Sequence, residues 1–214
     1  MEDRIILKKS IEKYLEVLKQ SGASAADTLD QGDPNSIREG IPFSEVDLTD
    51  ELVNYFSMVN GYSYEKCDDL GVDDPDFAWG MYALSWDQAR DQYSEISGIG
   101  GDENPDYWPK GFFPILYDGS GDFVLVNCLS DSITYGSVYD LSEGVGCNRI
   151  SDSISAFLDA SSVELEEGFR IFEDEETSVV PDVRAQLEKG REIFGETPYF
   201  LRMGKMDTQI IDWK

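Results

Sequence analysis

The sequence predicts an α+β protein, with a mixed, largely antiparallel sheet and helices from both ends of the chain packed against it. Three observations predict this class. Helical patterns lie toward both ends, strand-like apolar runs gather in the middle, and a turn rich in glycine and aspartate, residues 118–122, joins two of these runs directly. Glycine and aspartate in so short a connection predict a hairpin. With 214 residues, 41% of them hydrophobic, the chain can bury a core.

The first element is expected to be an amphipathic helix over residues 4–20. Ile11, Tyr14 and Leu18 repeat there with the spacing that places side chains on one helical face. Residues 21–42 are small, polar and interrupted by proline, so they predict a surface loop.

A second helix is expected to begin after Thr49, a candidate N-cap, and to end at Asn60 and Gly61, which supply a left-handed stop. The acidic segment from Cys67 to Asp76 is expected to form a loop. Residues 77–84 then predict a strand.

A third helix follows this strand. Ser85 and Gln88 have the spacing of a capping box, and Trp86 and Tyr93 fall on the face that points inward. Further strands are expected at about residues 112–117, 122–128 and 133–140, followed by a short helix at about 152–160.

Residues 1–160 are expected to form the main domain and residues 161–214 a C-terminal extension. Pro181 and Gly195 bracket a further predicted helix. The extension is apolar enough to need cover, so packing on the same domain is favoured, and dimerisation is the alternative. The last two strands are expected at residues 199–203 and 209–213.

The segment from Trp108 to Val126 is the most informative part of the chain. Its Trp-Pro-Lys-Gly-Phe start, its Asp-Gly-Ser-Gly-Asp turn, the earlier helix ending in Asn60-Gly61 and the later Phe157-Leu158 pair follow one another in order. This ordered set resembles the SUKH superfamily, the group of a fungal glucan-synthesis regulator and of many bacterial toxin-immunity proteins. The residues that carry the resemblance, mainly structural in role, are Asn60, Gly61, Trp108, Pro109, Gly111, Phe112, Asp118, Gly119, Gly121 and Asp122.

The resemblance covers residues 1–160 and implies the α+β fold with a mixed, largely antiparallel sheet, of five or six strands. The fold prediction given above follows this resemblance more than the strand count. The chain departs from the family just before the second helix. There Ile41-Pro42 is followed by Phe43 to Asp47, which has the character of an insertion. The resemblance also implies an immunity-type protein that neutralises a cognate polymorphic toxin by stoichiometric binding. A scaffold or regulator of cell-wall synthesis or signalling is the alternative that the same family implies.

The charge of the chain points to the kind of partner. The net charge is −27, and because residues 1–20 carry +1, the rest carries −28. Such a field repels nucleic acid and anionic membranes and attracts basic proteins, so the expected partner is a basic nuclease toxin, and contacts with nucleic acid or membranes are not expected. A merely solvated acidic surface is the alternative interpretation. The candidate partner-binding residues are Asp68, Asp69, Asp73, Asp74, Asp76, Glu173, Asp174, Glu175 and Glu176.

The sequence offers little to catalysis. It contains no histidine, which excludes the histidine-dependent nucleophile systems and histidine-zinc sites. No phosphate-binding or dinucleotide-binding glycine motif is complete. We therefore expect a binding protein rather than an enzyme, with no cofactor; a carboxylate-based hydrolase is the less favoured reading.

No metal site is expected either. Asp118, Ser120 and Asp122 fall at the first ligand positions of a calcium loop, but Phe123 and Leu129 replace its required glycine and glutamate. The acidic segment around Asp73 would bind a cation only weakly, so a solvated or partner-facing role is favoured there.

The cysteines and the N-terminus predict a cytoplasmic protein. Cys67, Cys128 and Cys147 are odd in number and widely spaced, which favours reduced, buried thiols over a disulfide framework. No signal peptide and no apolar run long enough to span a membrane is evident in the sequence.

Overall fold

A five-stranded antiparallel sheet forms the centre of the computed structural model, which describes residues 2–33, 35, 37, 43–73, 75–97, 108–142, 146–174 and 177–203. The strand order is β1-β2-β3-β4-β5, so each strand pairs with its neighbours in the sequence. This arrangement confirms the predicted α+β class. The strands are β1 (Tyr82–Ala83), β2 (Phe112–Tyr117), β3 (Phe123–Asn127), β4 (Val138–Ser142) and β5 (Gly146–Ser151).

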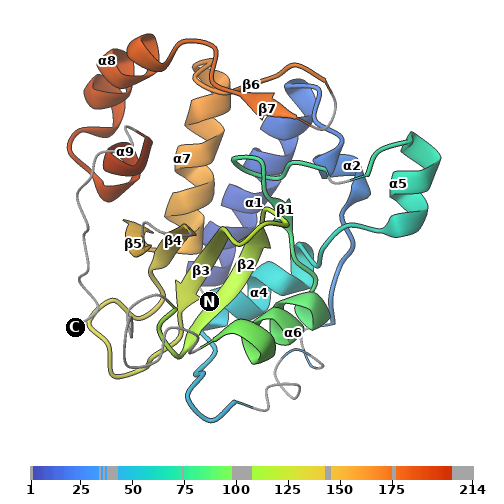
Figure 1. Ribbon diagram of the computed structural model, residues 1–214, viewed down its shortest axis with the longest axis vertical. Helices are drawn as coiled ribbons and strands as arrows, with labels where there is room; N and C mark the ends of the chain where they lie inside the picture. Colours follow the sequence, from blue (N-terminus) through green and yellow to red (C-terminus); the bar gives the residue numbers. More distant parts are fainter. Residues whose placement is uncertain are drawn as a thin grey trace.

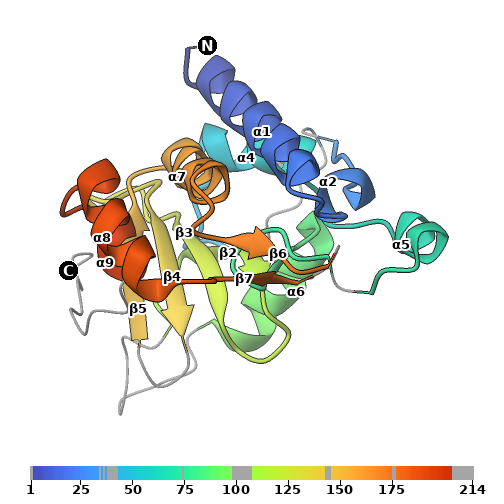
Figure 2. The same cartoon turned by 90° about the horizontal axis from the view of Figure 1, so that it is seen from above.

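Helices cover both faces of this sheet. Figure 2 shows α1 (Glu2–Gln20), α4 (Asp50–Met58) and α7 (Ile154–Glu166) on one side and α6 (Trp86–Ile96) on the other. In α1 the periodic positions Ile11, Tyr14 and Leu18 are all fully buried, as their spacing predicts. The apolar face of α1 packs chiefly against α7.

The smaller elements lie around this core (Figure 1). A second, two-stranded antiparallel sheet pairs β6 with β7. Near the C-terminus, α9 packs beside β5. These elements are α2 (Ala25–Thr28), α5 (Tyr64–Leu70), β6 (Ile171–Phe172), β7 (Ser178–Val179), α8 (Val183–Phe194) and α9 (Pro198–Met203).

Side-chain caps fix the starts of the main helices. The hydroxyl of Thr49 accepts the Leu52 N–H at 2.9 Å, and the predicted capping box of α6 is complete. The carboxylate of Glu51 accepts the N–H groups of Ile154 and Ser155 at the start of α7. Glu51 therefore joins α4 to α7 and places a negative charge at the positive end of a helix dipole.

Asn60 caps a different helix from the one expected. Helix α4 ends at Met58 with Val59 extended, so the Asn-Gly pair does not form its left-handed stop. Instead, Asn60 Oδ1 accepts the N–H of Trp86, the first residue of α6, at 2.7 Å. Gly61, at φ +74°, lies so close to Ser85 that a Cβ would stand 2.7 Å from the Ser85 nitrogen. The pair therefore brings the end of α4 against the start of α6.

Two segments that we expected to be loops contain helices. Residues 21–42 include α2, and the acidic segment begins inside α5. Helix α5 has its own N-cap at Ser63 and a left-handed C-cap at Gly71, with φ +71°. The prediction missed this helix because its acidic composition resembles that of a turn.

The strand predicted over residues 77–84 was wrong except at β1. Trp79 and Gly80 both have positive φ, +61° and +78°, which turns the chain back so that Ala78 pairs with Met81. Trp79 is the non-glycine residue with positive φ in the described part of the chain. The cost of such a backbone, about 1 kcal/mol or more, is offset by the contacts of its indole ring described below.

The C-terminal half also differs from expectation. Strand β4 begins at residue 138 rather than 133, β5 was not expected, and α7 continues to Glu166, past the proposed boundary at residue 160. Residues 199–203 lie in α9 instead of a strand, with Tyr199 and Phe200 buried. The strand proposed over 209–213 lies outside the described residues.

Candidate functional site

Most of the described acidic candidates lie on the surface. Asp68 and Asp69 are exposed on α5, and Asp73 is exposed just after it. Glu173 and Asp174 are exposed in the connection between β6 and β7. Asp74, Glu175 and Glu176 lie outside the described residues.

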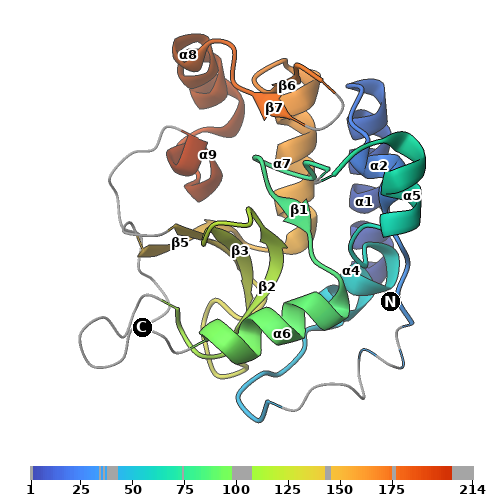
Figure 3. The same cartoon turned by 45° about the vertical axis from the view of Figure 1, so that its right-hand side comes forward.

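Asp76 is the exception, because it is buried with 3% of its surface exposed. Its carboxylate accepts the N–H of Ser178 at 3.1 Å and also the Ser178 hydroxyl. Ser178 lies on β7, so this bond fastens the segment that follows α5 to the β6–β7 hairpin. Figure 3 shows α5 and this hairpin. Asp76 thus joins the two acidic segments and does not face a partner itself.

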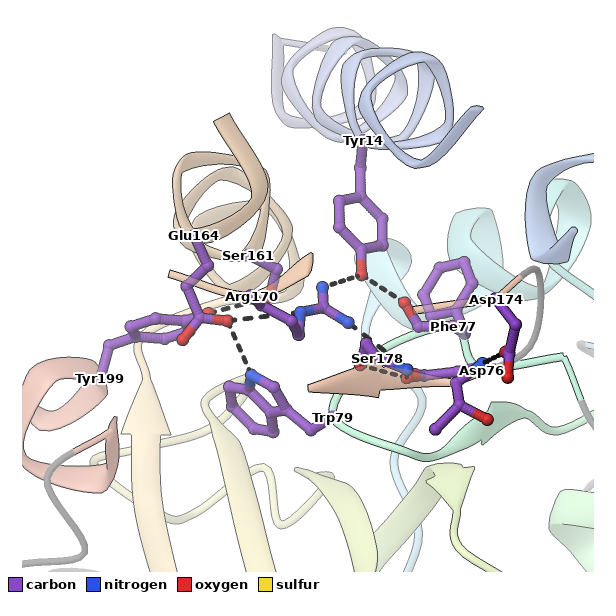
Figure 4. A network of polar contacts seen from close by, with 11 residues as sticks. Tyr14, Asp76, Phe77, Trp79, Ser161, Glu164, Arg170, Asp174, Ser178 and Tyr199 are labelled. Atoms are coloured by element: carbon purple, nitrogen blue, oxygen red, sulfur yellow. Dashed lines mark hydrogen bonds and ion pairs between the residues drawn. The ribbon is translucent and has the colours of Figure 1, made fainter. Parts of the chain in front are cut away.

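A buried network of charged groups surrounds Asp76 (Figure 4). Arg170 is 3% exposed, and its guanidinium lies 3.8 Å from Asp76 on one side and 3.8 Å from Glu164 on the other. It donates a hydrogen bond to the Tyr14 hydroxyl at 3.0 Å, and Tyr14 donates to the carbonyl of Phe77. One arginine therefore contacts residues of α1, α7 and the segment before β1.

Trp79 and Tyr199 complete this network. The indole Nε1 of Trp79 donates to Glu164 at 2.9 Å, and its ring packs edge-on against Phe157 with ring centres 5.2 Å apart. The Tyr199 hydroxyl lies 3.1 Å from the Ser161 hydroxyl. These contacts hold the tight turn at Trp79 against α7 and α9.

The buried setting changes the ionisation of the network. Burial raises the pKa of Tyr14 to about 12, although Arg170 acts in the opposite direction. Burial would lower the pKa of Arg170, but the contacts with Tyr14, Glu164 and Asp76 outweigh this effect and raise it. Arg170 therefore stays charged inside the protein, and its role is to compensate two buried carboxylates.

Aromatic side chains accompany the acids on α5. Tyr64 is 69% exposed and Leu70 48% exposed, beside Asp68 and Asp69 on the same short helix. The ring of Tyr64 packs edge-on against Tyr62, with centres 5.4 Å apart. We did not expect these contacts from the sequence; the alternating tyrosines before the acidic run are the signal that could have indicated them. Aromatic side chains are enriched in protein–protein interfaces, whereas aspartate is depleted from the interface core, so the acids of α5 would lie at the polar rim of such a surface.

The motif residues around Trp108 have a structural role. Trp108 is 1% exposed, and its Nε1 donates to the carbonyl of Phe112 at 2.9 Å. Gly111 has φ +80°, and a Cβ there would stand 2.4 Å from the side chain of Leu129. Pro109 is also buried. This part of the motif forms the entrance to β2 and leaves little surface for a partner.

The Asp118 to Asp122 turn is held by a single carboxylate. Asp118 Oδ1 accepts the N–H groups of Ser120, Gly121 and Asp122 at 2.8 to 3.0 Å. Partial burial raises the pKa of Asp118, but the hydrogen bonds from the Ser120 hydroxyl and from the three N–H groups outweigh it, so the pKa lies below its ordinary value. Gly119, at φ +82°, lets the chain reverse. The carboxylate is thus occupied with its own turn.

The thiols are poorly placed for nucleophilic chemistry. Cys67, Cys128 and Cys147 are buried thiols that form no disulfide, and burial raises the pKa of Cys128 and of Cys147 far above the ordinary value. Among the described residues, no group of three or more carboxylate or thiol side chains is arranged to hold a metal ion. None of the helices in the described ranges is both long enough and apolar enough to cross a bilayer.

The model of one known protein family matches more than half of the chain. The model of the SMI1 / KNR4 family (SUKH-1) matches residues 42–160, which run from just before α4 into α7. The match confirms the resemblance inferred from the motifs. A search of curated proteins finds no match. The buried network of Arg170 therefore connects the matched segment, through Asp76 and Trp79, to residues on either side of it.

Proposed function

Because the chain belongs to the SMI1 / KNR4 family (SUKH-1), we propose that it is an immunity-type protein that binds and neutralises a cognate toxin. The family supports an immunity-type or SMI1/KNR4-type function in general, and its members generally bind partner proteins. We further propose that the partner is a basic nuclease, and the net charge of the chain supports this proposal.

The charge of −27 favours a basic partner for a physical reason. Opposite charge accelerates the diffusional encounter of two proteins, and this effect weakens as salt screens the field. A nuclease must bind polyanions, so its active surface is basic and attracts an acidic inhibitor. Covering that surface would block the enzyme without any chemical step.

The acidic side chains of α5 are the candidates for this attraction. Asp68, Asp69 and Asp73 are all exposed, and Tyr64 beside them offers an aromatic contact. Charges at the edge of an interface act mainly on the association rate, since they remain solvated in the complex. We therefore assign to α5 a role in attracting the partner.

The proposal predicts that a reading frame beside the gene for this chain encodes a polymorphic toxin with a nuclease domain, and the test uses that domain. Increasing amounts of the protein are added to a fixed amount of that domain, and the remaining nuclease activity is measured. We expect activity to fall linearly to a sharp end-point at a fixed molar ratio, with no change when a chelator is added to the protein beforehand. Progressive loss of the toxin at sub-stoichiometric amounts would show turnover and contradict the proposal.

A charge-reversal pair tests the role of α5. The double variant D68K/D69K should associate about tenfold more slowly than the unchanged protein at low salt, with a difference that shrinks as salt rises. The matched control is D91K/E95K, which reverses two exposed acids on α6. Equal association rates for the two variants would remove α5 from the encounter.

The alternative from the regulator branch of the family is a scaffold that binds several proteins weakly. It predicts no single partner that co-purifies at a fixed ratio. The sharp end-point described above would therefore also decide against the scaffold.

A further inference from the structure

A buried asparagine side chain forms hydrogen bonds with the loop between β3 and β4, residues 129–136. Asn127 is fully buried, and its Nδ2 donates to the hydroxyls of Ser132 and Thr134, each at 2.9 Å. Its Oδ1 accepts the N–H of Leu129 at 2.9 Å. One side chain therefore binds the beginning and the middle of the loop.

The second half of the loop is held in the same way. The hydroxyl of Tyr139, itself fully buried, donates to Thr134 Oγ1 at 2.8 Å. The N–H of Gly136 donates to the Asn127 carbonyl at 2.8 Å, and the Ser137 N–H donates to the Thr134 carbonyl at 2.9 Å. Bonds of this number and burial fix the loop in one conformation.

This rigid loop presents apolar side chains to solvent. Ile133, at its tip, is 90% exposed, which is the largest exposure among the large hydrophobic residues of the described chain. Tyr135 is 38% exposed, and its hydroxyl donates to the carbonyl of Asp47 at 3.0 Å. A single exposed apolar residue is ordinary. Ile133 differs because buried side chains hold its loop in one conformation. The backbone of the loop has therefore lost most of its conformational entropy on folding, and binding a partner would cost little more.

Acidic residues lie on this loop and beside it. Asp131 is exposed two residues before Ile133, and Asp47 and Asp50 are exposed beside Tyr135. Burial, followed by the nearby charge of Asp47, raises the pKa of Tyr135 to about 12. The tip is therefore an apolar centre with a negatively charged edge, the arrangement that stable interfaces have.

We propose that residues 129–136 form the anchor of the contact with the basic partner, with Ile133 inserted into an apolar pocket whose edge carries lysine or arginine. This inference rests on the proposed function and adds the surface on which the complex closes. Charge complementarity selects the occupant: a second copy of this chain would place Asp47, Asp50 and Asp131 against the acidic surface of a protein with a net charge of −27. A basic protein meets the same residues with attraction.

The inference divides the binding kinetics between two surfaces. Solvated acids on α5 act on association, whereas a desolvated anchor acts on dissociation, because its contacts exist only in the formed complex. Removing the anchor should therefore leave the encounter unchanged and shorten the life of the complex.

The experiment measures association and dissociation rates of the neighbouring toxin's nuclease domain with four variants, I133S, I133L, V183S and Y64S. I133S should raise the dissociation rate at least tenfold and leave the association rate within twofold of the unchanged protein. I133L, which keeps the apolar volume, should dissociate within threefold of the unchanged protein. The control is V183S, at the start of α8, where Val183 is 56% exposed. Figures 1 and 3 show α8 and α4 at opposite ends of the molecule. V183S should behave as the unchanged protein does.

The outcomes separate this inference from the proposed function. If the unchanged protein binds the toxin and I133S dissociates at the same rate, the anchor is elsewhere and the inference is wrong, while the proposed function stands. A faster dissociation of Y64S alone would place the anchor on α5 and also overturn it. If the unchanged protein does not bind the toxin domain, both fail. A dimer of the unchanged protein that I133S dissolves would identify a second copy as the occupant, against the inference.

Discussion

The network around Arg170 and the network around Asn127 both consist of buried polar side chains, but they stabilise different parts of the molecule. Arg170 compensates two buried carboxylates and connects α1, the segment before β1 and α7, three parts of the fold that are far apart in sequence. Asn127 binds neutral groups within a dozen residues of itself. The first network holds the fold together, and the second holds one loop still.

The two networks also differ in where they lie relative to the segment that the family model matches. Asn127 and its partners all lie within residues 42–160, whereas Arg170, Tyr14 and Glu164 lie outside that range. The Arg170 network fastens the flanking segments to the matched domain. The loop that Asn127 holds is joined by the Tyr135 hydroxyl to the carbonyl of Asp47, three residues before α4. Its rigidity serves the surface it presents, which is the basis of our inference for Ile133.

The largest expected effect comes from removing the charge of Arg170. R170M should destabilise the protein by about 3–5 kcal/mol, because Asp76 and Glu164 would remain buried without compensation. Urea unfolding followed by circular dichroism measures this loss. The control is R184M, since Arg184 pairs with Glu188 on the surface of α8 with 88% of its side chain exposed, and its loss should cost less than about 0.5 kcal/mol. Equal stability of the two variants would mean that Arg170 is not a structural centre.

Asn127 should have a smaller effect that is confined to its loop. N127L leaves the Leu129 N–H and two hydroxyls without their partner, which should cost about 1–3 kcal/mol. Amide hydrogen exchange should accelerate in residues 129–136 and remain unchanged in α7. S130A, at an exposed position in the same loop, is the control. Exchange that accelerates throughout the protein would show that Asn127 supports the whole sheet.

Asp118 provides a third case, a turn held by a partly exposed carboxylate. Its folded pKa is below the ordinary value of 3.8, so the folded state binds fewer protons than the unfolded state at acidic pH. Its contribution is therefore complete above about pH 4 and is lost as the pH falls further. D118N should be less stable than the unchanged protein at pH 7 by about 1–2 kcal/mol, with the difference narrowing toward pH 2. A difference that stays constant with pH would contradict the role of the charge.

Ile133 should have the smallest effect on stability. Because its side chain is 90% exposed, I133S should change the free energy of unfolding by less than about 0.5 kcal/mol. A thermal melt compared with that of I133L measures this. A large loss would mean that Ile133 packs against the fold, and its exposure would then not be available to a partner.

The sequence predicted the parts of the fold that depend on local patterns. The apolar face of α1, the caps at Thr49 and Ser85 and the β2–β3 hairpin all follow from residues close together in the chain. Local patterns could not reveal the Arg170 network, because its members come from positions as far apart as Tyr14 and Arg170. Asp76 looked like a surface acid for the same reason.

The β3–β4 loop shows how tertiary contacts override local preference. Ile133, Thr134 and Tyr135 favour a strand, and a strand over residues 133–140 was predicted. The side chains of Asn127 and Tyr139 instead bind Thr134 and delay the start of β4 to Val138. The sequence prediction therefore did not include residues 129–136 as a partner-binding surface, because it selected the acidic segments by charge alone.

Hydroxyl-radical footprinting of the complex with the neighbouring toxin's nuclease domain tests the central claim most directly, because it measures the solvent exposure of individual side chains. In the free protein, Ile133 and Tyr135 should be oxidised readily, as should Val183 on α8. In the complex we expect oxidation of Ile133 and Tyr135 to fall at least fivefold while Val183 stays unchanged. Unchanged oxidation of Ile133 in a saturated complex would contradict the assignment of residues 129–136 as the anchor.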